Sequence, residues 1–230
     1  MTKNQTALIV GASRGLGLAL AEEFLKRGWN VVGTAKEGKR TGLHELAENS
    51  GERLRIEYVD ITDPSQIERL KASVAGTSLG LLFVNAGIAN PRHETIGEVP
   101  TEDFVRVMVT NALSPMRVVE RLADNVSPRG IIGAMSSGLG SVGNNEAGGF
   151  EVYRASKAAL NTLLRSFAAR RAEGRSLVLI APGWVQTDMG GPEATFTIAE
   201  VIPKIADTIM AQAGKTGLRY LDRSGESVQW

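Results

Sequence analysis

Short apolar runs alternate with longer amphipathic segments along the whole chain. In the short runs, apolar residues occupy successive positions, so both faces of a strand would be apolar. This pattern predicts strands buried on both faces at residues 6–11, 30–35, 54–60, 79–87, 130–137 and 176–183. Apolar residues recur at helical spacing in the segments between them, at residues 15–27, 42–49, 64–74, 101–126, 149–173 and 198–212. This order predicts a single α/β domain over residues 1–230, with a Rossmann-type doubly wound parallel sheet of about seven strands and helices on both faces.

Two glycine-rich loops follow predicted strands. The segments GLGSVGNNEAGG and GWVQTDMGGPEA each come after the carboxyl end of a strand. Open α/β sheets bind their ligands at that edge. We therefore expect the substrate loops at about residues 138–149 and 184–198.

The charge balance argues against a polyanionic partner. The 230 residues include 26 Lys and Arg against 25 Asp and Glu, so the formal net charge is +1. We therefore expect a small-molecule substrate, with no nucleic acid and no membrane as partner. The sequence has no cysteine, which excludes disulfides and thiolate catalysis. His44 and His93 have no partners at metal-ligand spacing, so no metal site is expected.

Neither a signal peptide nor a membrane span is predicted from the sequence. The first residues lack the basic and then apolar pattern of a signal peptide. The longest apolar-leaning run, LGLLFVNAGIA, is far shorter than the roughly 20 residues of a membrane span. A soluble cytoplasmic protein is the expectation.

The segment VGASRGLGLAL carries three glycines between a predicted strand and a predicted helix. Gly11, Gly15 and Gly17 would let the backbone approach a pyrophosphate, and the helix N-terminus would offer free N–H groups to that anion. The spacing is G-x-x-x-G-x-G rather than the commoner G-x-G-x-x-G. Tight packing of strand against helix is the alternative reason for such glycines. The position after the first strand favours a dinucleotide.

The end of the second predicted strand indicates which dinucleotide is bound. An acidic residue there would bind the ribose hydroxyl of NAD, whereas the 2′-phosphate of NADP needs cations. The chain has Lys36 at this point, and Arg14 in the glycine loop could reach the same phosphate. NADP(H) is therefore the expected cofactor. If Glu37 rather than Lys36 points inward, the preference weakens or reverses.

The segment VYRASKAAL places a phenol and an ammonium one helical turn apart. Tyr153 and Lys157 would share a helix face. A phenol has an ordinary pKa near 10, so it exchanges protons poorly at neutral pH unless its surroundings change that pKa. Such a pair is common on helix surfaces. Here it follows a strand that ends in two serines, in a chain that opens with the glycine loop.

These segments together resemble the short-chain dehydrogenase/reductase family over nearly the whole chain. The resemblance rests on GASRGLG, NAG at residues 85–87, Asn111, SSGLG, YRASK and PGWVQTD. Within the family, the chain is similar to the C-factor-like and Sniffer-like carbonyl reductases. The shared features are the longer loop before Tyr153, the GGP after the Thr-Asp pair and a short tail ending in Trp.

The resemblance implies four catalytic residues. Ser137 would orient the substrate carbonyl, and Tyr153 would exchange the proton with its oxygen. Lys157 would lower the pKa of Tyr153 and hydrogen-bond the nicotinamide ribose. Asn111 would hold a water that links Lys157 to solvent. Ser136 is the alternative to Ser137, which we prefer because it begins the Ser-x-x-Gly pattern.

The resemblance also implies the cofactor contacts. Asp60 and Ile61 would contact the adenine, the NAG segment would support it, and Thr187 would lie near the carboxamide. The full set is Gly11, Ser13, Arg14, Gly15, Leu16, Gly17, Lys36, Asp60, Ile61, Asn85, Ala86, Gly87, Tyr153, Lys157, Pro182, Gly183, Val185 and Thr187.

The expected activity is NADPH-dependent reduction of a small aldehyde or ketone. The alternative from another class is a dinucleotide-binding signalling or regulatory protein of the C-factor type, in which turnover is secondary. The resemblance suggests a homodimer or homotetramer formed through the predicted helices at 101–126 and 149–173, although monomers occur in the carbonyl-reductase branch. The sequence does not identify the substrate or the physiological direction.

Overall fold

A parallel sheet forms the middle of the structure, a computed structural model that describes residues 5–90, 94–171 and 174–230. Its strands are β1 (Thr6–Val10), β2 (Asn30–Ala35), β3 (Leu54–Tyr58), β4 (Leu79–Val84), β5 (Val126–Met135), β6 (Ser176–Ala181) and β7 (Gly217–Asp222). They pair in the order β3-β2-β1-β4-β5-β6-β7, and every neighbouring pair is parallel. The predicted single-domain Rossmann-type fold is confirmed.

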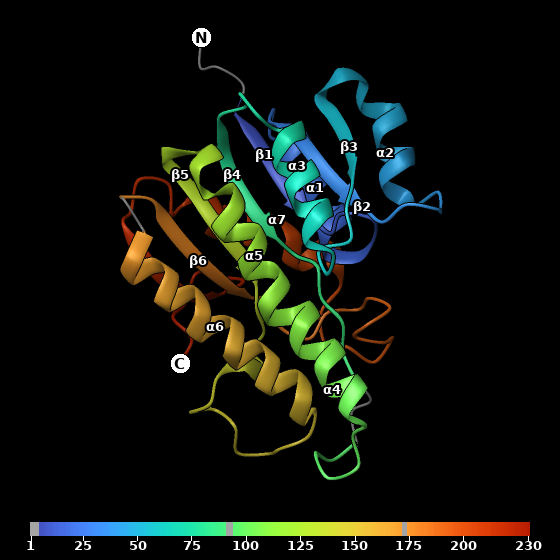
Figure 1. The fold of residues 1–230 in the computed structure, drawn as a ribbon, viewed down its shortest axis with the longest axis vertical. Coiled ribbons are helices and arrows are strands. Elements are labelled where there is room, and N and C mark those ends of the chain that lie inside the picture. The colour runs from blue at the N-terminus through green and yellow to red at the C-terminus, as the bar shows by residue number, and fades with distance from the viewer. Residues whose placement is uncertain (1–4, 91–93, 172–173) are drawn as a thin grey trace.

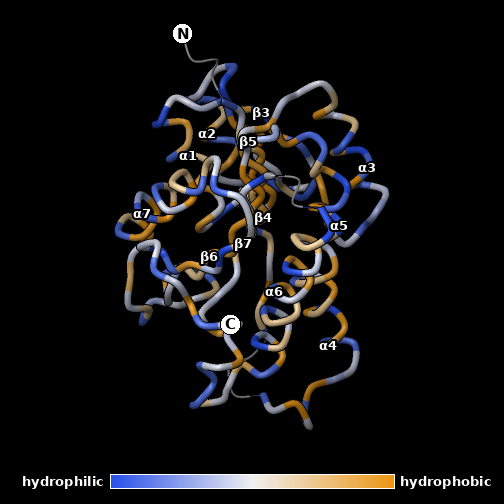
Figure 2. The backbone as a smooth tube through the Cα atoms, turned by 90° about the vertical axis from the view of Figure 1, so that its left-hand side faces the viewer, coloured by the Kyte–Doolittle hydropathy of each residue, from blue (hydrophilic) through white to orange (hydrophobic). Residues whose placement is uncertain are grey.

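Helices cover both faces of this sheet. They are α1 (Gly15–Lys26), α2 (Gly42–Ser50), α3 (Pro64–Ser73), α4 (Thr101–Met108), α5 (Ser114–Leu122), α6 (Glu151–Arg171) and α7 (Ile198–Met210). Figure 2 shows α1, α2 and α7 on one side of the strands, and α3, α5 and α6 on the other. Each face therefore has its own hydrophobic core, one around Phe24 and Leu43 and the other around Leu164 and Phe167.

The strand order reverses beside β1, which lies between β2 and β4. The loops that leave these strands diverge to opposite faces, so a crevice forms at their carboxyl ends. Figure 1 shows the loops after β5 and β6 at the same end of the sheet, where α4 and the start of α6 also lie. Both predicted substrate loops are therefore at the ligand-binding edge.

The predicted helix at 101–126 is interrupted. A π-helical segment, Val109–Leu113, separates α4 from α5, and a short 3-10 turn, Ala123–Asn125, follows α5 before β5 begins at Val126. Pro115 contributes to the interruption because it has no N–H to donate within the helix. The strand predicted at 130–137 begins at Val126, because the helix before it ends earlier than expected. It ends at Met135.

Most other predicted elements differ from the observed ones by one to three residues at their ends, and two differences matter for the site. The helix expected over 149–173 begins at Glu151, and its predicted last residues, 172–173, lie outside the described part of the chain. The seventh strand, β7, had no position assigned from the sequence. Its residues include Arg219 between Leu218 and the buried Tyr220, so it lacks the continuous apolar run of the central strands.

Substitution of Phe24 tests the core on the α1 face. Phe24 is fully buried, and its ring lies 5.1 Å from the ring of Trp29. We expect Phe24→Ala to lower the free energy of unfolding by about 3–5 kcal/mol in urea titrations, because it leaves a large cavity. The control is Glu22→Ala on the same helix, whose exposed ion pair with Lys26 contributes about 0.5 kcal/mol or less. Equal losses in the two variants would contradict this account of the core.

Candidate active site

The glycine loop packs tightly against the strand beside it. Gly11 has a φ of +88°, and a Cβ there would lie 2.7 Å from the backbone nitrogen of Ala86. A Cβ on Gly17 would overlap the carbonyl oxygen of Gly11, which accepts a hydrogen bond of 2.9 Å from Asn85 Nδ2. Glycine is therefore required at both positions by the fold itself. Asn85 acts by fixing this loop.

The N-terminus of α1 fits an anionic group. Its N-cap residue, Arg14, makes no capping hydrogen bond with its side chain, and the first turn has no acidic residue. The first backbone N–H groups of the helix are therefore left for an anion, such as a pyrophosphate. A cavity of about 380 Å³ adjoins this turn, lined by Arg14, Gly15, Gln186, Thr187, Asp188, Gly191, Pro192 and Ile198. The glycine loop and the loop after β6 thus face one space.

The two cations expected at the 2′-phosphate each pair with a carboxylate. Lys36 Nζ lies 2.6 Å from Asp60 Oδ2, and Arg14 Nη1 lies 3.2 Å from Asp188 Oδ2. Burial of Asp60 opposes its ionisation, but hydrogen bonds from Lys36 and Thr62 outweigh that effect and hold its pKa below the ordinary value. Both cationic side chains are exposed, so these ion pairs are weak and can be exchanged for a ligand.

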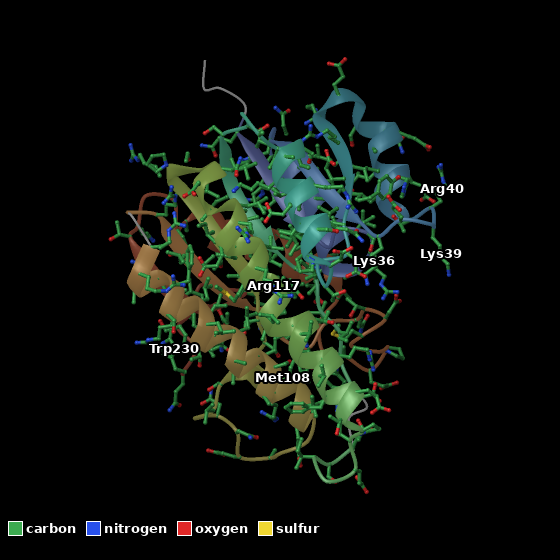
Figure 3. All side chains as sticks on the ribbon, viewed as in Figure 1. Lys36, Lys39, Arg40, Met108, Arg117 and Trp230 are labelled. Atoms are coloured by element: carbon green, nitrogen blue, oxygen red, sulfur yellow. The ribbon has the colours of Figure 1, made fainter. Side chains whose placement is uncertain are left out.

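Further cations lie near Lys36. Figure 3 shows Lys36, Lys39 and Arg40 on the same side of the molecule, in the segment between β2 and α2. Arg40 is engaged with Glu48 in a bidentate pair with distances of 2.8 and 2.7 Å. Glu37 is exposed, as Lys36 is, so exposure does not distinguish the two as the residue that contacts the ribose.

The two hydroxyls of the predicted catalytic set come together at the end of β5. The Tyr153 phenol, on α6, is within hydrogen-bonding reach of the Ser137 hydroxyl. Ser137 Oγ also accepts a hydrogen bond of 3.2 Å from the backbone nitrogen of Leu139. Ser136 Oγ points elsewhere, since it donates a 2.6 Å hydrogen bond to Asn161 Oδ1 and is buried. The geometry thus favours Ser137 over Ser136.

Burial controls the acidity of Tyr153. It raises the pKa of the phenol to about 12, and the hydrogen bond with Ser137 lowers it only in part. The expected net lowering of this pKa by Lys157 is not found, because burial dominates. Lys157 Nζ lies 5.7 Å from the centre of the Tyr153 ring and donates a 2.8 Å hydrogen bond to the carbonyl oxygen of Met135 instead.

Lys157 is a buried cation with a perturbed pKa. Only 3% of the residue is exposed, and burial lowers the pKa of its ammonium group to about 8. A Cβ on Gly87 would lie 3.5 Å from Lys157 Nζ and 3.3 Å from Asn111 Oδ1. The end of β4, the interrupted helix and α6 therefore meet at this ammonium.

Asn111 lies in the π-helical segment with its side chain fully engaged. Asn111 Oδ1 accepts a hydrogen bond from the Ile88 nitrogen at 2.8 Å. Asn111 Nδ2 donates to the Ile88 oxygen at 2.8 Å and to Ser156 Oγ at 3.0 Å. Both amide hydrogens are therefore used within the protein. The side-chain amide serves to join the segment after β4 to α6.

The remaining predicted cofactor residues follow the same edge of the sheet. Ile61 is buried behind Asp60. Val185 is buried and forms a β-bridge with Phe196, which closes the base of the loop after β6. Thr187 Oγ1 accepts a 3.1 Å hydrogen bond from the Gly190 nitrogen. Of the other members, Ser13 lies in the segment that leaves β1, Leu16 lies in the first turn of α1, and Pro182 and Gly183 lie in the segment that leaves β6.

Several polar residues around the site were missed from the sequence. Asp188 lies within the quoted motif PGWVQTD but had no assigned partner, and it pairs with Arg14. Asn90 Oδ1 accepts a 3.1 Å hydrogen bond from the Tyr153 nitrogen. Tyr220 comes from the strand that was not located, and its hydroxyl donates a short hydrogen bond to the carbonyl oxygen of Ser137. Of these three residues, Asn90 has the clearest signal in the sequence, because it is a polar residue shortly after the end of β4.

A metal ion and a membrane span lack support in the described part of the chain. Among the residues that the structure describes, no group of three or more His, Asp or Glu side chains could hold a metal ion. No helix in the same residues is both long and apolar enough to cross a bilayer.

The sequence profile of the short chain dehydrogenases matches residues 5–196. The chain belongs to this family. The predicted family is therefore confirmed, and the matched region contains every predicted catalytic residue. Members of the short-chain dehydrogenase family are oxidoreductases that use a nicotinamide dinucleotide, which agrees with the class of cofactor predicted from the glycine loop.

Solved structures of this family superpose closely on the chain. One from Burkholderia multivorans with bound NADP is 57% identical, with a TM-score of 0.97, over 99% of this chain and 100% of that chain. A carbonyl reductase from Pseudomonas aeruginosa PAO1 in complex with NADP is 35% identical, with a TM-score of 0.92, over 99% and 100% of the chains. The carbonyl reductase Sniffer of D. melanogaster is 28% identical, with a TM-score of 0.88, over 99% of each chain.

Two curated short-chain dehydrogenase relatives bear on function. C-signal of Myxococcus xanthus is 35% identical over 153 residues, which is 65% of this chain and 92% of that protein. The NADPH-dependent pterin aldehyde reductase of Arabidopsis thaliana is 35% identical over 190 residues, which is 80% of this chain and 76% of that protein. The predicted resemblance to C-factor-like and Sniffer-like proteins is confirmed.

Replacement of Lys157 tests the effect of its burial on stability. The pKa falls from 10.5 to about 8 on folding, so the folded state disfavours the charged form. We expect Lys157→Met to raise the free energy of unfolding by about 1–3 kcal/mol near neutral pH. This range already includes the cost of losing the hydrogen bond from Lys157 to the Met135 carbonyl oxygen. Above about pH 8 the folded wild type loses its proton first, so the difference shrinks as the pH approaches 10.5.

Urea unfolding at several pH values measures this difference. The control is Lys26→Met, because Lys26 is exposed on α1 and its ion pair is with Glu22 on the same helix. A Lys157→Met protein that is less stable than the wild type at neutral pH would show that the buried ammonium stabilises the fold.

Proposed function

We propose that this short-chain dehydrogenase uses NADPH to reduce the carbonyl group of a small aldehyde or ketone. The observation that carries the proposal is the meeting of the Ser137 hydroxyl and the Tyr153 phenol beside the buried ammonium of Lys157. Two hydroxyl donors at one point suit a carbonyl oxygen that becomes more negative during reduction. The similar carbonyl reductases of P. aeruginosa and D. melanogaster support this substrate class.

NADP(H) would bind along the carboxyl ends of β1, β2 and β4. We propose as its contacts Gly11, Ser13, Arg14, Gly15, Leu16, Gly17, Lys36, Asp60, Ile61, Asn85, Ala86, Gly87, Tyr153, Lys157, Pro182, Gly183, Val185 and Thr187. The free N–H groups of α1 suit the pyrophosphate, and Lys36 with Arg14 suits the 2′-phosphate. When bound, the reduced dinucleotide supplies the hydride. The NADP complex of the B. multivorans protein supports this choice.

Tyr153 is the proton donor in this mechanism. With a pKa of about 12 it is protonated at neutral pH, which is the form that reduction requires. Ser137 donates a hydrogen bond to the carbonyl oxygen and orients it. Transfer of the Tyr153 proton to that oxygen leaves a phenolate, and the nearby ammonium of Lys157 stabilises it.

The water of the proton path would sit on the backbone of Asn111. The side-chain amide of Asn111 is engaged with Ile88 and Ser156, so the main-chain carbonyl is the better site. In an α-helix the donor to this carbonyl would be residue 115, a proline without an N–H, whereas in the π-helical pattern it would be the nitrogen of residue 116. We propose that the water binds this carbonyl where the helix changes from one pattern to the other.

The substrate would lie between the loops at about residues 138–149 and 184–198, within the single domain of residues 1–230. Apolar side chains project from both loops, since Val142, Trp184 and Met189 are 73%, 47% and 52% exposed. This composition supports an apolar carbonyl compound. We also propose a homodimer or homotetramer through α4, α5 and α6. Val105 on α4, Leu113 in the π-helical segment and Leu163 on α6 are exposed there.

Removal of the Tyr153 hydroxyl is the principal test. We expect Tyr153→Phe to lower kcat by about 10²–10⁴-fold, because only the transferable proton is lost. The dissociation constant for NADPH, measured by fluorescence titration, stays near that of the wild type. Oxidation of NADPH would be followed with a panel of aldehydes, ketones and diketones. Tyr58→Phe, at an exposed tyrosine on β3, is the control. Turnover that survives in Tyr153→Phe would end the proposed acid role.

Replacement of Lys36 tests the cofactor preference. We expect Lys36→Asp to lower the ratio of kcat/KM for NADPH to that for NADH by at least about tenfold, because attraction for the 2′-phosphate becomes repulsion. Lys39→Asp makes the same change of charge three residues away and is the control. An unchanged ratio in Lys36→Asp would assign the preference to another residue, with Glu37 the first to examine.

The relative C-signal favours a second candidate function, a dinucleotide-binding signalling or regulatory protein with little turnover. The same panel separates the two candidates. Turnover of any carbonyl compound with NADPH supports the reductase. Tight NADPH binding by the wild type without turnover across the panel supports the regulator.

A further inference from the structure

The backbone of Ser137 is held by a residue from the far edge of the sheet. Its carbonyl oxygen accepts a hydrogen bond of 2.9 Å from the Gly140 nitrogen and a short one from the Tyr220 hydroxyl. Tyr220 belongs to β7 and is 2% exposed. The two donors fix the peptide group that follows Ser137, and with it the backbone from which the Ser137 side chain projects.

The Tyr220 hydroxyl also faces the polar groups that surround Ser137. Burial raises the pKa of Tyr220, while interactions with Asn161 and Ser136 lower it in part. The phenol therefore stays protonated and can act as a donor. Asn161 Nδ2 in turn donates a 3.3 Å hydrogen bond to the Gly140 oxygen. The turn after β5 is thus fixed to both β7 and α6.

Trp230 covers Tyr220 and contacts the substrate loop. Its ring lies 5.4 Å from the Tyr220 ring, and the Arg165 guanidinium on α6 lies 4.5 Å from the Trp230 ring. The Trp230 carbonyl oxygen accepts hydrogen bonds from the Gly143 nitrogen at 3.2 Å and from Ser141 Oγ at 3.5 Å. Figure 3 shows Trp230 beside α6, on the side where the ribbon of residues 138–149 also passes.

Other contacts hold Trp230 in register with β7. The Val228 nitrogen donates a 2.9 Å hydrogen bond to the Tyr220 oxygen, and Leu221 forms an antiparallel bridge with Ser227. The segment after β7 therefore folds back along its own strand. A movement at Trp230 would reach both Tyr220 and the loop at Gly143.

We propose that Tyr220 and Trp230 are positioning residues for carbonyl reduction, with Tyr220 orienting Ser137 and Trp230 holding the loop at residues 138–149 against the substrate. This inference rests on the proposed reductase function. Neither residue touches the reacting atoms. Their effect comes through the placement of a hydrogen-bond donor, and a misplacement of about 1 Å costs about 100-fold in rate.

The test separates two steps of the reaction. Tyr220→Phe keeps the ring against Trp230 and removes only the donor to Ser137. We expect kcat for carbonyl reduction to fall about 10–100-fold, with the dissociation constant for NADPH unchanged. Trp230→Ala removes the ring that packs against Tyr220 and Arg165 and keeps the carbonyl that accepts from Gly143 and Ser141. The carbonyl is then less firmly placed against the loop, so we expect the KM for the carbonyl substrate to rise more than kcat falls. Trp230→Phe restores an aromatic ring and is expected to recover most of that loss.

Hydrogen exchange tests the same contacts without substrate. We expect faster exchange of the backbone amides at residues 139–143 in Tyr220→Phe and in Trp230→Ala, measured by mass spectrometry on proteins that unfold at the same temperature as the wild type. Tyr58→Phe is the matched control, because it removes a tyrosine hydroxyl that contacts only His44, at 3.0 Å, among the described hydrogen bonds. Its exchange and turnover should equal those of the wild type.

The outcomes distinguish this proposal from the reductase function. Turnover that survives in Tyr153→Phe would refute the acid mechanism whatever the Tyr220 variants do. If Tyr153→Phe is inactive but Tyr220→Phe keeps wild-type kcat and wild-type exchange, the positioning role of Tyr220 is wrong and the reductase stands. If Trp230→Ala and Trp230→Phe have the same KM as the wild type, the loop does not depend on the Trp230 ring.

Discussion

A buried ammonium group organises the candidate active site. Lys157 is almost entirely removed from solvent, and its hydrogen bond to the Met135 carbonyl ties α6 to the last residue of β5. The backbone must come close on both sides of this side chain. A Cβ on Gly140 would lie 2.9 Å from Lys157 Cβ, and one on Gly87 would lie 3.5 Å from its Nζ. The position of residue 157 on α6 therefore restricts residue 140 to glycine, and Gly87 brings the backbone after β4 to within contact distance of the ammonium.

The charged groups at the other end of the crevice are exposed to solvent, in contrast to Lys157. Lys36, Arg14 and Asp188 are exposed, so their ion pairs are worth little in water and can be replaced at small cost. Lys157 cannot change partners in that way, because any partner must come to it in the interior. The structure thus combines a buried, fixed ammonium at the site proposed for proton transfer with adaptable contacts where a phosphate would bind.

The sequence predicts the structure best at positions where a residue type has a single geometric role. The glycines lie in the turn after β1 and the Tyr-Lys pair lies on one helix, as the sequence predicted, because backbone proximity and helical spacing are local properties. Contacts between distant segments were not foreseen. Tyr220 meets Ser137 only through the pairing of β7 beside β6, and nothing in the local pattern of Arg219 and its neighbours indicates that partner. The acidity of Tyr153 was misjudged for a similar reason, since burial depends on the whole fold.

The uncapped N-terminus of α1 has a consequence for the stability and the abundance of the protein. Folding leaves those N–H groups without a side-chain acceptor in the described chain, so an anion that binds there adds to the stability of the folded state. The stabilisation grows with the logarithm of ligand concentration. Proteolysis acts on the unfolded fraction, so the abundance of this protein in a cell is expected to follow the supply of its dinucleotide.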